Sequence, residues 1–365
     1  MHTLGSLHEL WSARNHLQPL ADRAESPFLG IDWIVSAAEA FHRDAELQVK
    51  LLASGGETVA VAPLVARRRN GHEALELIGT PALTERAGLL HGGYDALKAL
   101  VRDLVRLGPP VHLRGIDLTG ATMRALREVI EGERRGVVLT KDTHTCLSLP
   151  IEQPWTEYVR TLSPEMHHDL GRVASQAAAL GHTRFEMLTP STDDVPGMLT
   201  MLTAMEESTG TRGEPGGAAR REQLNTFYAA LASRAATRGT LRVGVLHIGQ
   251  KAAAMQLCLE AYQRLWLLKA ADDHAFTHVS PGFLLMHQIV RYAHEQRLAA
   301  VEFLGEAAPW QMRWQPVERT YTSALAVPLT ARGLSDLALD TVSRAARRWL
   351  PSTRGMQASP LSPEL

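Results

Sequence analysis

Apolar positions recur along the chain with two spacings, every second residue and every three to four residues, which divide it into short strands and amphipathic helices. The elements expected in the first part are helices 4–24 and 28–41, a hairpin of strands 47–52 and 58–64, strand 74–78, helix 94–107, strand 111–116, helix 121–131 and strand 137–139. Those expected in the second part are helices 155–162 and 163–181, strand 182–188, helices 198–208 and 219–237, strands 241–248, 252–261 and 265–270, helix 283–295, strand 299–304 and helix 334–349. A helix pair, a hairpin, a strand, a helix and a strand thus come twice, which predicts two related α/β lobes.

Proline residues mark the main break between the two parts. The segment 150–154 begins and ends with proline, and Ser163 followed by Pro164 is typical of a helix start just after it. We therefore expect an N-terminal helix (1–25), a first lobe (26–150), a second lobe that carries the site (151–330), and a C-terminal helix with a flexible tail (331–365).

Composition and charge narrow the class of protein. The 365 residues are 45% hydrophobic and 21% charged with a formal net charge of −1, which is ordinary for a soluble globular protein and argues against binding DNA through an overall positive field. Cys146 and Cys258 are the only cysteines, so the sequence has no disulfide framework and no cysteine-rich metal motif. It also has no apolar run of 18 residues, and we expect a cytoplasmic protein without a membrane span.

The segment 265–314 has the pattern on which a site is most often built. A strand leads into Ser280-Pro281-Gly282, which opens the helix 283–295. The free N–H groups at a helix N-terminus favour an anionic ligand by about 0.3–1 kcal/mol. The plainer interpretation is a serine that caps the helix, with proline at its first position.

Acidic residues lie on either side of this helix. Asp273, in the run that precedes the break, is a candidate to accept a proton from an amine, although such runs are often solvated turns. Glu302 lies on an otherwise apolar strand, where a carboxylate needs a partner or a shifted pKa. It is a candidate general base or amine-binding group, or else a member of an ion pair with a residue such as Lys269. His274 and His278 lack a third ligand, so no metal site is expected.

The segment after this strand has further candidate binding residues. Glu306 follows the strand's end, where open α/β sheets present ligands. Trp310 and Trp314 are four residues apart, and packing is their plainer role, whereas Arg313 between them carries a guanidinium suited to phosphate. A Gly-x-Ser-x-Gly elbow and a P-loop are both missing from the sequence, which lowers the hydrolase and NTPase interpretations.

Several passages together resemble a known family. They are Ser26-Pro27-Phe28 with Trp33, Val61-Ala62-Pro63-Leu64, Lys269 with Asp273 and Phe276 before Ser280-Pro281-Gly282-Phe283-Leu284-Leu285, and Val301-Glu302-Phe303-Leu304-Gly305 followed by Trp310-Gln311 and Trp314. The chain from 26 to 327 is similar to the GNAT acyltransferases, and more closely to the bacterial CelD/BcsL-like acyltransferases, which carry two GNAT-like lobes in tandem and are distantly similar to the FemAB aminoacyl transferases. The resemblance implies an α/β fold in which each lobe is a mixed, mostly antiparallel sheet flanked by helices.

The resemblance also implies an activity. It is the transfer of an acyl group, most simply acetyl, from acyl-CoA to the amine of a small molecule or peptide by direct attack, without a metal. In this interpretation Asp273 or Glu302 takes the proton. The residues that would contact acyl-CoA are Ser280, Gly282, Phe283 and Arg313. Those that would contact the substrate are Lys269, Asp272, Glu306 and Trp310.

Two departures from the family pattern bear on the donor. Asp272 stands where the family has tyrosine, and Trp310-Gln311 stands where it has Tyr-Lys, so a cationic contact is missing. The glycine-rich pyrophosphate loop of ordinary acetyl-CoA enzymes is absent too. Two alternatives therefore stay open, a FemAB-like transferase that uses aminoacyl-tRNA and a non-catalytic tandem scaffold that binds a ligand. The sequence specifies neither the acceptor nor the oligomeric state.

Overall fold

The computed structural model describes residues 1–69, 72–83, 85–208 and 217–330. The elements of the first half, residues 1–150, are β1 (His2–Leu4), α1 (Leu7–Arg23), η1 (Pro27–Leu29), α2 (Ile31–Phe41), β2 (Val49–Ser54), β3 (Glu57–Ala62), β4 (Leu64–Arg69), β5 (His72–Leu77), β6 (Leu90–His91), α3 (Tyr94–Leu107), β7 (Val111–Asp117), α4 (Ala121–Leu126), η2 (Arg127–Gly132) and β8 (Gly136–Pro150). Those of the second half, residues 151–330, are α5 (Trp155–Thr161), α6 (Pro164–Leu180), β9 (Thr183–Leu188), α7 (Val195–Ser208), α8 (Gly217–Thr237), β10 (Leu241–Ile248), β11 (Lys251–Ala261), β12 (Arg264–Asp272), η3 (His274–Val279), α9 (Pro281–Glu295), β13 (Ala300–Glu302), α10 (Pro309–Met312) and β14 (Val317–Pro328).

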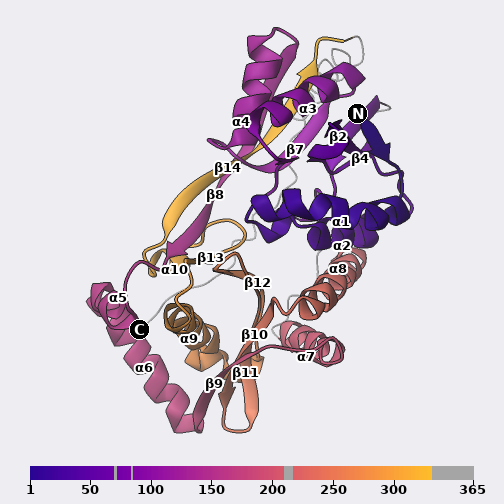
Figure 1. Ribbon diagram of the computed structural model, residues 1–365. Helices are drawn as coiled ribbons and strands as arrows, with labels where there is room; N and C mark the ends of the chain where they lie inside the picture. Colours follow the sequence, from indigo (N-terminus) through magenta and orange to yellow (C-terminus); the bar gives the residue numbers. More distant parts are fainter. Residues whose placement is uncertain (70–71, 84, 209–216, 331–365) are drawn as a thin grey trace, which may run out of the picture.

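One large sheet runs through both halves. Its ten strands have the order β4-β5-β7-β14-β8-β13-β12-β11-β10-β9, and a second sheet of four strands has the order β1-β2-β3-β6. Most pairs are antiparallel, and β5–β7 and β12–β13 are the parallel pairs of the described strands. The long strands β8 and β14 lie along the middle of the molecule and link its two ends (Figure 1). The expected fold class, mixed and mostly antiparallel sheets flanked by helices, is confirmed.

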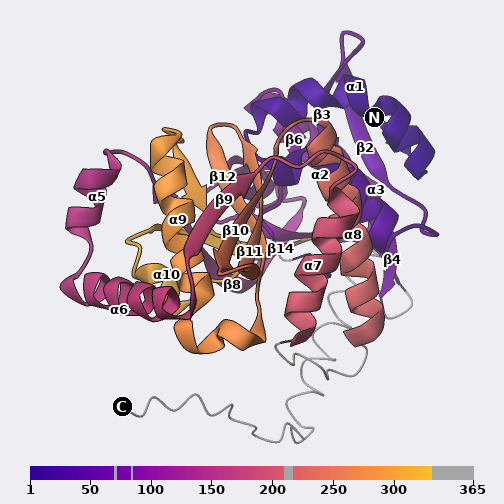
Figure 2. The ribbon, with the colours of Figure 1, turned by 90° about the horizontal axis from the view of Figure 1, so that it is seen from below.

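Helices cover both faces of the second-half sheet. Helices α6 and α9 lie on one side of strands β9–β12, and α7 and α8 lie on the other (Figure 2). The predicted start of α6 is confirmed, because the Ser163 hydroxyl accepts the Met166 N–H at 3.1 Å and Pro164 takes the first helical position. The two faces therefore have different neighbours, since α8 also packs on α2 of the first half.

Aromatic side chains join the two halves in one hydrophobic cluster. The ring of Trp33 lies 4.8 Å from that of Phe227 on α8, and Phe28 lies 5.2 Å from Trp266 on β12, centroid to centroid. The same cluster includes buried residues of α1, α2, α7, α8 and β10–β12. Burial of this apolar surface holds the helix pair of the first half against the sheet of the second.

Most of the expected helices and strands are present, but the short strands β1, β4 and β6 were not expected, and two long strands differ as well. Strand β8 extends from Gly136 to Pro150, far beyond the expected 137–139, and β14 lies at residues 317–328, where we expected no strand. Strand β14 pairs with β7 and β8, although it falls within the predicted second lobe (151–330). The expected helix 334–349 and the tail lie outside the described residues.

Candidate active site

The sheet opens where its two central parallel strands part. Strands β12 and β13 pair only through Arg264–Trp266 and Ala300–Glu302, after which β13 ends and β12 continues to Asp272. On its other side, β13 pairs with β8, which brings Ser148 opposite Glu302. The carboxyl ends of parallel strands are where α/β sheets usually bind ligands. This opening is therefore the natural place for a site.

Glu302 is at the centre of an ion cluster in this opening. Its side chain is buried, with a relative exposure of 1% for the residue. The Arg86 guanidinium donates to Oε2 at 2.5 Å, Arg264 pairs with Oε1, and the Ser148 hydroxyl donates to Oε1 at 3.0 Å. Burial opposes the charge of Arg86, but the Glu302 carboxylate outweighs it and keeps the Arg86 pKa above its usual value.

The partner that we expected for Glu302 is a different one. Lys269 instead forms an ion pair with Glu206 on α7, with 2.8 Å between Nζ and Oε2. The Lys269 ammonium also lies 5.2 Å from the ring centre of Tyr228 on α8. Lys269 therefore belongs to the α7–α8 side of the sheet, and Glu302 is neutralised by arginines.

A loop of the first half delivers Arg86 and its neighbour Glu85 to this opening. The loop follows β5, and its backbone is tied to β7 by the Ala87 N–H, which donates to the Gly115 carbonyl at 2.8 Å. A Cβ atom on Gly115 would lie 2.2 Å from the carbonyl oxygen of Glu85, and Gly115 has a φ of +68°. Only glycine allows so close an approach of the loop.

Glu85 is the functional candidate that the sequence did not reveal. The Gly305 N–H, just beyond β13, donates to its partly buried carboxyl group. Burial raises the pKa of Glu85 to about 6, and the Gly305 N–H and Arg86 offset only part of this effect. Burial, followed by the charges of Glu85 and Glu206, also raises the pKa of Tyr228. The opening thus holds a carboxyl group that titrates near neutral pH, next to a phenol that stays neutral.

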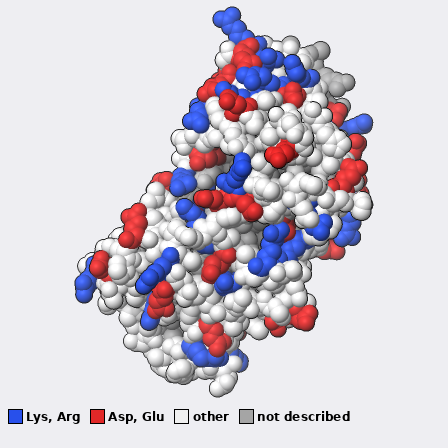
Figure 3. Space-filling view, viewed as in Figure 1, with Lys and Arg blue, Asp and Glu red and all other residues white. Residues whose placement is uncertain are grey.

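Cavities adjoin this opening on several sides. One of about 450 Å³ includes Glu302 and residues from both halves. A second, of about 550 Å³, lies between α7 and α8 and reaches Tyr228 and Lys269. Basic and acidic side chains lie side by side near the middle of the molecule, level with the junction of the halves (Figure 3). Of the predicted site residues, only Glu302 lines the first cavity and only Lys269 the second.

The N-terminus of α9, expected to bind an anion, already has a carboxylate of its own chain. The Gly282 N–H donates to Asp272, whose pKa is raised by burial and partly lowered again by this bond. A Cβ on Gly282 would lie 2.8 Å from both carboxylate oxygens of Asp272. Ser280 has left-handed backbone angles and its side chain makes no capping hydrogen bond. Asp272, Ser280 and Gly282 thus lie together, but they form a self-contained helix start.

Asp273 and Glu306 lie in different surroundings. The Asp273 carboxylate accepts the Ala275 N–H at 2.9 Å and caps the short helix η3. Glu306 is exposed and lines a cavity of about 360 Å³ together with Arg114 and His144.

The other predicted binding residues make mainly structural contacts. The Arg313 guanidinium lies over the ring of Phe283 at 5.1 Å and pairs with Asp169 of α6 at 2.7 Å. Trp310 is 49% exposed and touches Phe303 edge-on. Gln311 turns inward, where its side-chain oxygen accepts the Ala308 N–H at 2.7 Å.

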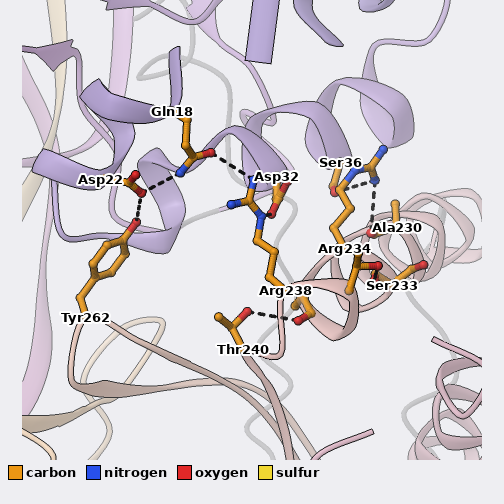
Figure 4. A network of polar contacts seen from close by, with 12 residues as sticks. Gln18, Asp22, Asp32, Ser36, Ala230, Ser233, Arg234, Arg238, Thr240 and Tyr262 are labelled. Atoms are coloured by element: carbon orange, nitrogen blue, oxygen red, sulfur yellow. Dashed lines mark hydrogen bonds and ion pairs between the residues drawn. The ribbon is translucent and has the colours of Figure 1, made fainter. Parts of the chain in front are cut away.

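A further cavity, of about 530 Å³, lies where α1 and α2 meet α8. Around it, Arg238, just after α8, pairs with Asp32 and donates to the Gln18 side chain, which in turn donates to Asp22 at 2.7 Å (Figure 4). The Tyr262 hydroxyl, on the turn between β11 and β12, donates to the same Asp22 carboxylate at 3.4 Å. These polar side chains hold the two halves together and satisfy one another.

The described part of the chain has neither a metal-binding cluster nor a membrane-spanning helix. Within residues 1–69, 72–83, 85–208 and 217–330, no group of three or more His, Cys, Asp or Glu side chains is placed to hold a metal ion. None of the helices in these ranges is both long and apolar enough to cross a membrane.

Comparison with known proteins identifies the fold. Residues 165–312 match a family model described as an acetyltransferase (GNAT) domain. The matched range includes β12, α9 and β13, and the sheet opening described above lies between the two strands β12 and β13. No curated protein matches the sequence.

Solved structures with similar folds are distant in sequence. The C-terminal domain of a putative lysylphosphatidylglycerol synthetase from Agrobacterium fabrum has a TM-score of 0.55 and 11% identity, over 91% of this chain and 97% of that one. L-PGS from Bacillus licheniformis has a TM-score of 0.54 and 10% identity, over 92% and 96%. FemX has a TM-score of 0.52 and 11% identity, over 88% and 97%. At these identities the likeness concerns the fold.

Proposed function

We propose that this protein is an N-acyltransferase of the CelD/BcsL-like type, and that an amine attacks the acyl donor where β12 and β13 part. The observation that carries the proposal is Glu85, a carboxyl group with a pKa of about 6 on the Gly305 N–H at the carboxyl end of β13. At neutral pH this group is mostly ionised and can accept a proton from the attacking amine. The match of residues 165–312 to GNAT acetyltransferase domains supports acyl transfer as the reaction.

The reaction balances with the groups present. The amine nitrogen forms a bond to the acyl carbon, the bond between that carbon and the leaving group breaks, and the amine proton passes to Glu85 directly or through one water. The ion cluster of Arg86 and Glu302 holds the loop that carries Glu85, so these two residues position the base. A correctly placed base contributes about 10²–10⁴-fold to the rate.

The start of α9 does not fit the diphosphate of acyl-CoA, because the Asp272 carboxylate already faces the Gly282 N–H. Two anions at one helix N-terminus repel each other. The same observation favours a second candidate, a FemAB-like transfer from aminoacyl-tRNA, in which a diphosphate has no role at this helix. Gln311 agrees with it, since the family lysine is replaced by a side chain that bonds inward.

The test is an acyl-transfer assay with each donor class. The purified protein is incubated with acetyl-CoA, longer acyl-CoAs or aminoacyl-tRNA and a panel of amines, and the acylated amine is detected by mass spectrometry. We expect turnover with one donor class and its loss in Glu85→Gln, whereas Glu157→Gln, on the exposed side of α5, serves as the matched control. Absence of an acylated amine with every donor would overturn the proposal.

A variant at Asp272 separates the two donor classes. Asp272→Asn keeps the size of the side chain but removes its charge from the start of α9. If the donor is acyl-CoA, we expect its Kd to fall by about 2- to 5-fold, the usual size of one charge effect at a helix terminus. If CoA affinity does not change and aminoacyl-tRNA supports turnover, the donor is the tRNA.

A further inference from the structure

The cavity of about 450 Å³ between the halves has an unusual set of charges. Four arginines and three carboxylates line it, together with apolar and aromatic side chains. The arginines are Arg23, Arg86, Arg264 and Arg319, and the carboxylates are Glu25, Asp117 and Glu302. Its volume lies within the range of about 300–1,000 Å³ that is usual for small-molecule sites.

Two of the three carboxylates already have partners in the chain. Glu302 is shared by Arg86 and Arg264, so one negative charge faces two guanidinium groups. Asp117 accepts both the backbone N–H and the hydroxyl of Thr119 at 2.9 Å. With four arginines against three carboxylates, the cavity as a whole has one positive charge in excess.

Two arginines at the mouth retain free donors. In the described part of the chain, Arg319 on β14 forms no ion pair, and its side chain is exposed. Arg23, at the end of α1, donates to the Gly92 carbonyl at 3.3 Å and leaves the rest of its fork free. An arginine fork binds the oxygens of a phosphate or carboxylate in pairs.

The Arg86 side chain, on the cavity floor, is held in place by its neighbours in the chain. The Arg86 guanidinium lies 5.7 Å from the ring centre of Trp266 and 5.5 Å from that of Tyr321. It also donates to the Leu147 carbonyl at 3.1 Å. Because its neighbours already hold the side chain, little conformational entropy is lost when a ligand binds.

We propose that this cavity binds the phosphate or carboxylate of a ligand, through Arg319 and Arg23 at the mouth and Arg264 on the floor. Anion binding follows from the cavity and its charges alone and does not depend on the proposed function. Its assignment to the acceptor rests on the proposed function. Because the loop that carries Glu85 also lines this cavity through Arg86 and Ala87, the acceptor is an amine that carries an oxyanion.

Binding is measured first, without any reaction. Inorganic phosphate and succinate are titrated against the full chain by calorimetry at low ionic strength, and the double variant Arg23→Gln/Arg319→Gln is compared with Arg160→Gln, an exposed arginine of α5 outside the cavity. We expect the double variant to bind about tenfold more weakly or worse, and Arg160→Gln to match the parent chain. Equal binding by all three proteins would overturn the site.

The role of the site is measured with matched amines. Ethanolamine, β-alanine and O-phosphoethanolamine carry no anion, a carboxylate and a phosphate, and their kcat/KM values are compared with whichever donor turns over. We expect the preference for one anionic amine over ethanolamine to fall about tenfold in Arg319→Gln, mainly through KM. An unchanged preference would overturn the assignment to the acceptor. If no donor supports turnover, the proposed function fails, whereas the binding titration still decides the site.

Discussion

The carboxylates of Glu302 and Glu85 both lie near the end of β13, Glu302 on the strand itself and Glu85 on a loop of the first half. Their different neighbours give them different roles. Glu302 forms ion pairs with two guanidinium groups, those of Arg86 and Arg264, and accepts the Ser148 hydroxyl. Burial raises the pKa of Glu85 to about 6. The hydrogen bond from the Gly305 N–H and the charge of Arg86 lower the pKa, but they offset only part of this effect. Glu302 is thus a member of an ion cluster, whereas Glu85 has a pKa suited to proton exchange near neutral pH.

Replacing Glu85 is predicted to lower activity and raise stability. The pKa of Glu85 is higher in the folded chain, about 6, than the ordinary 4.5, so its stabilising contribution is present below pH 4.5 and is lost as pH rises through 6. Above pH 6 the ionised group costs about 2 kcal/mol, at 1.36 kcal/mol per pKa unit. Glu85→Gln should therefore raise the free energy of unfolding by about 1–2 kcal/mol at pH 7.5 and much less at pH 4.5.

Urea unfolding at the two pH values measures this change, and acyl-transfer rates measure the activity. We expect the rising limb of kcat/KM, with an apparent pKa near 6, to disappear in Glu85→Gln. Glu157→Gln, which changes an exposed carboxylate of α5, is the control. A Glu85→Gln protein that keeps both the rate and the limb would rule Glu85 out as the base.

His42 is predicted to make stability depend on pH in the opposite direction. Burial, and then the charge of Arg67, lower its pKa from 6.5 to about 4, and its Nε2 accepts the Gly79 N–H at 3.0 Å where the Glu85 loop begins. The contribution of neutral His42 to the free energy of unfolding is present above pH 6.5 and is lost as pH falls towards 4. Between pH 7 and pH 5 the loss amounts to about 2 kcal/mol.

Unfolding measurements on His42→Gln test this expectation. Glutamine keeps an acceptor for the Gly79 N–H but does not titrate, so the variant should lose about 2 kcal/mol less than the parent between pH 7 and pH 5. His16→Gln, at an exposed position, is the matched control. Parallel pH profiles for His42→Gln and the parent would contradict the prediction.

The sequence could reveal some of these residues but not their partners. Glu302 lies in an otherwise apolar strand, so the sequence predicted that its carboxylate needs a partner. An ion pair was one of the alternatives, and the structure has ion pairs with two arginines. Its partner Arg86 lies 216 positions away, a separation at which no local pattern operates. Glu85 lies in a loop without periodicity, and its pKa depends on burial that only the folded chain creates.

At the scale of elements, the loop that carries Glu85 and Arg86 depends on one glycine. In Gly115→Ala the new Cβ would lie 2.2 Å from the Glu85 carbonyl, and the positive φ adds strain. The loop must therefore shift, which we expect to cost about 1–3 kcal/mol of stability and to lower acyl-transfer activity at least tenfold.

Thermal unfolding and the transfer assay check this prediction together. The control is Gly197→Ala on α7, where a Cβ meets nothing within 4 Å and should stabilise the helix slightly. If Gly115→Ala loses stability but keeps full activity, the loop position does not control the reaction.

Most helices, and strands with regular apolar spacing such as β10 and β11, were predictable, whereas the long strands β8 and β14 were not. The middle of β8, residues 140–145, is polar and mostly exposed or half-buried, so it lacks the alternation that marks a strand. Strand β14 begins with four exposed residues and ends in a buried run. The two strands are hydrogen-bonded to each other along most of β14, and this pairing stabilises an extended backbone that neither sequence pattern predicts.

The sequence predicted helix α9 but not the group that its N-terminus contacts. The Ser-Pro-Gly break predicted the helix, and the structure has it at Pro281–Glu295. The free N–H groups expected at its start are partly satisfied by Asp272, because strand β12 extends to that residue. Where the preceding strand ends thus decides what the helix N-terminus can bind.

Across the whole molecule, the shared hydrophobic cluster predicts one cooperative unfolding transition. Phe227 of α8 is fully buried and touches Trp33 of the first half. Phe227→Ala should cost about 3–5 kcal/mol, and the loss should affect both halves together. Calorimetry and tryptophan fluorescence should then report the same lowered midpoint.

The control for this variant is Met201→Ala, an exposed residue of α7 that should change the midpoint little. Two separate transitions, with only one shifted by Phe227→Ala, would show that the predicted lobes 26–150 and 151–330 unfold independently. A single shifted transition would show that they unfold as one unit.

The position of β14 also sets an order of events during synthesis. Strands β7 and β8 leave the ribosome first, but the strand that lies between them follows only after residues 151–316. Until then each has an open edge, and open edges are prone to pair with other chains. The first half can therefore complete its sheet only late in translation. A nascent chain that stalls within the second half would leave that gap unfilled, which makes it a candidate for chaperone binding.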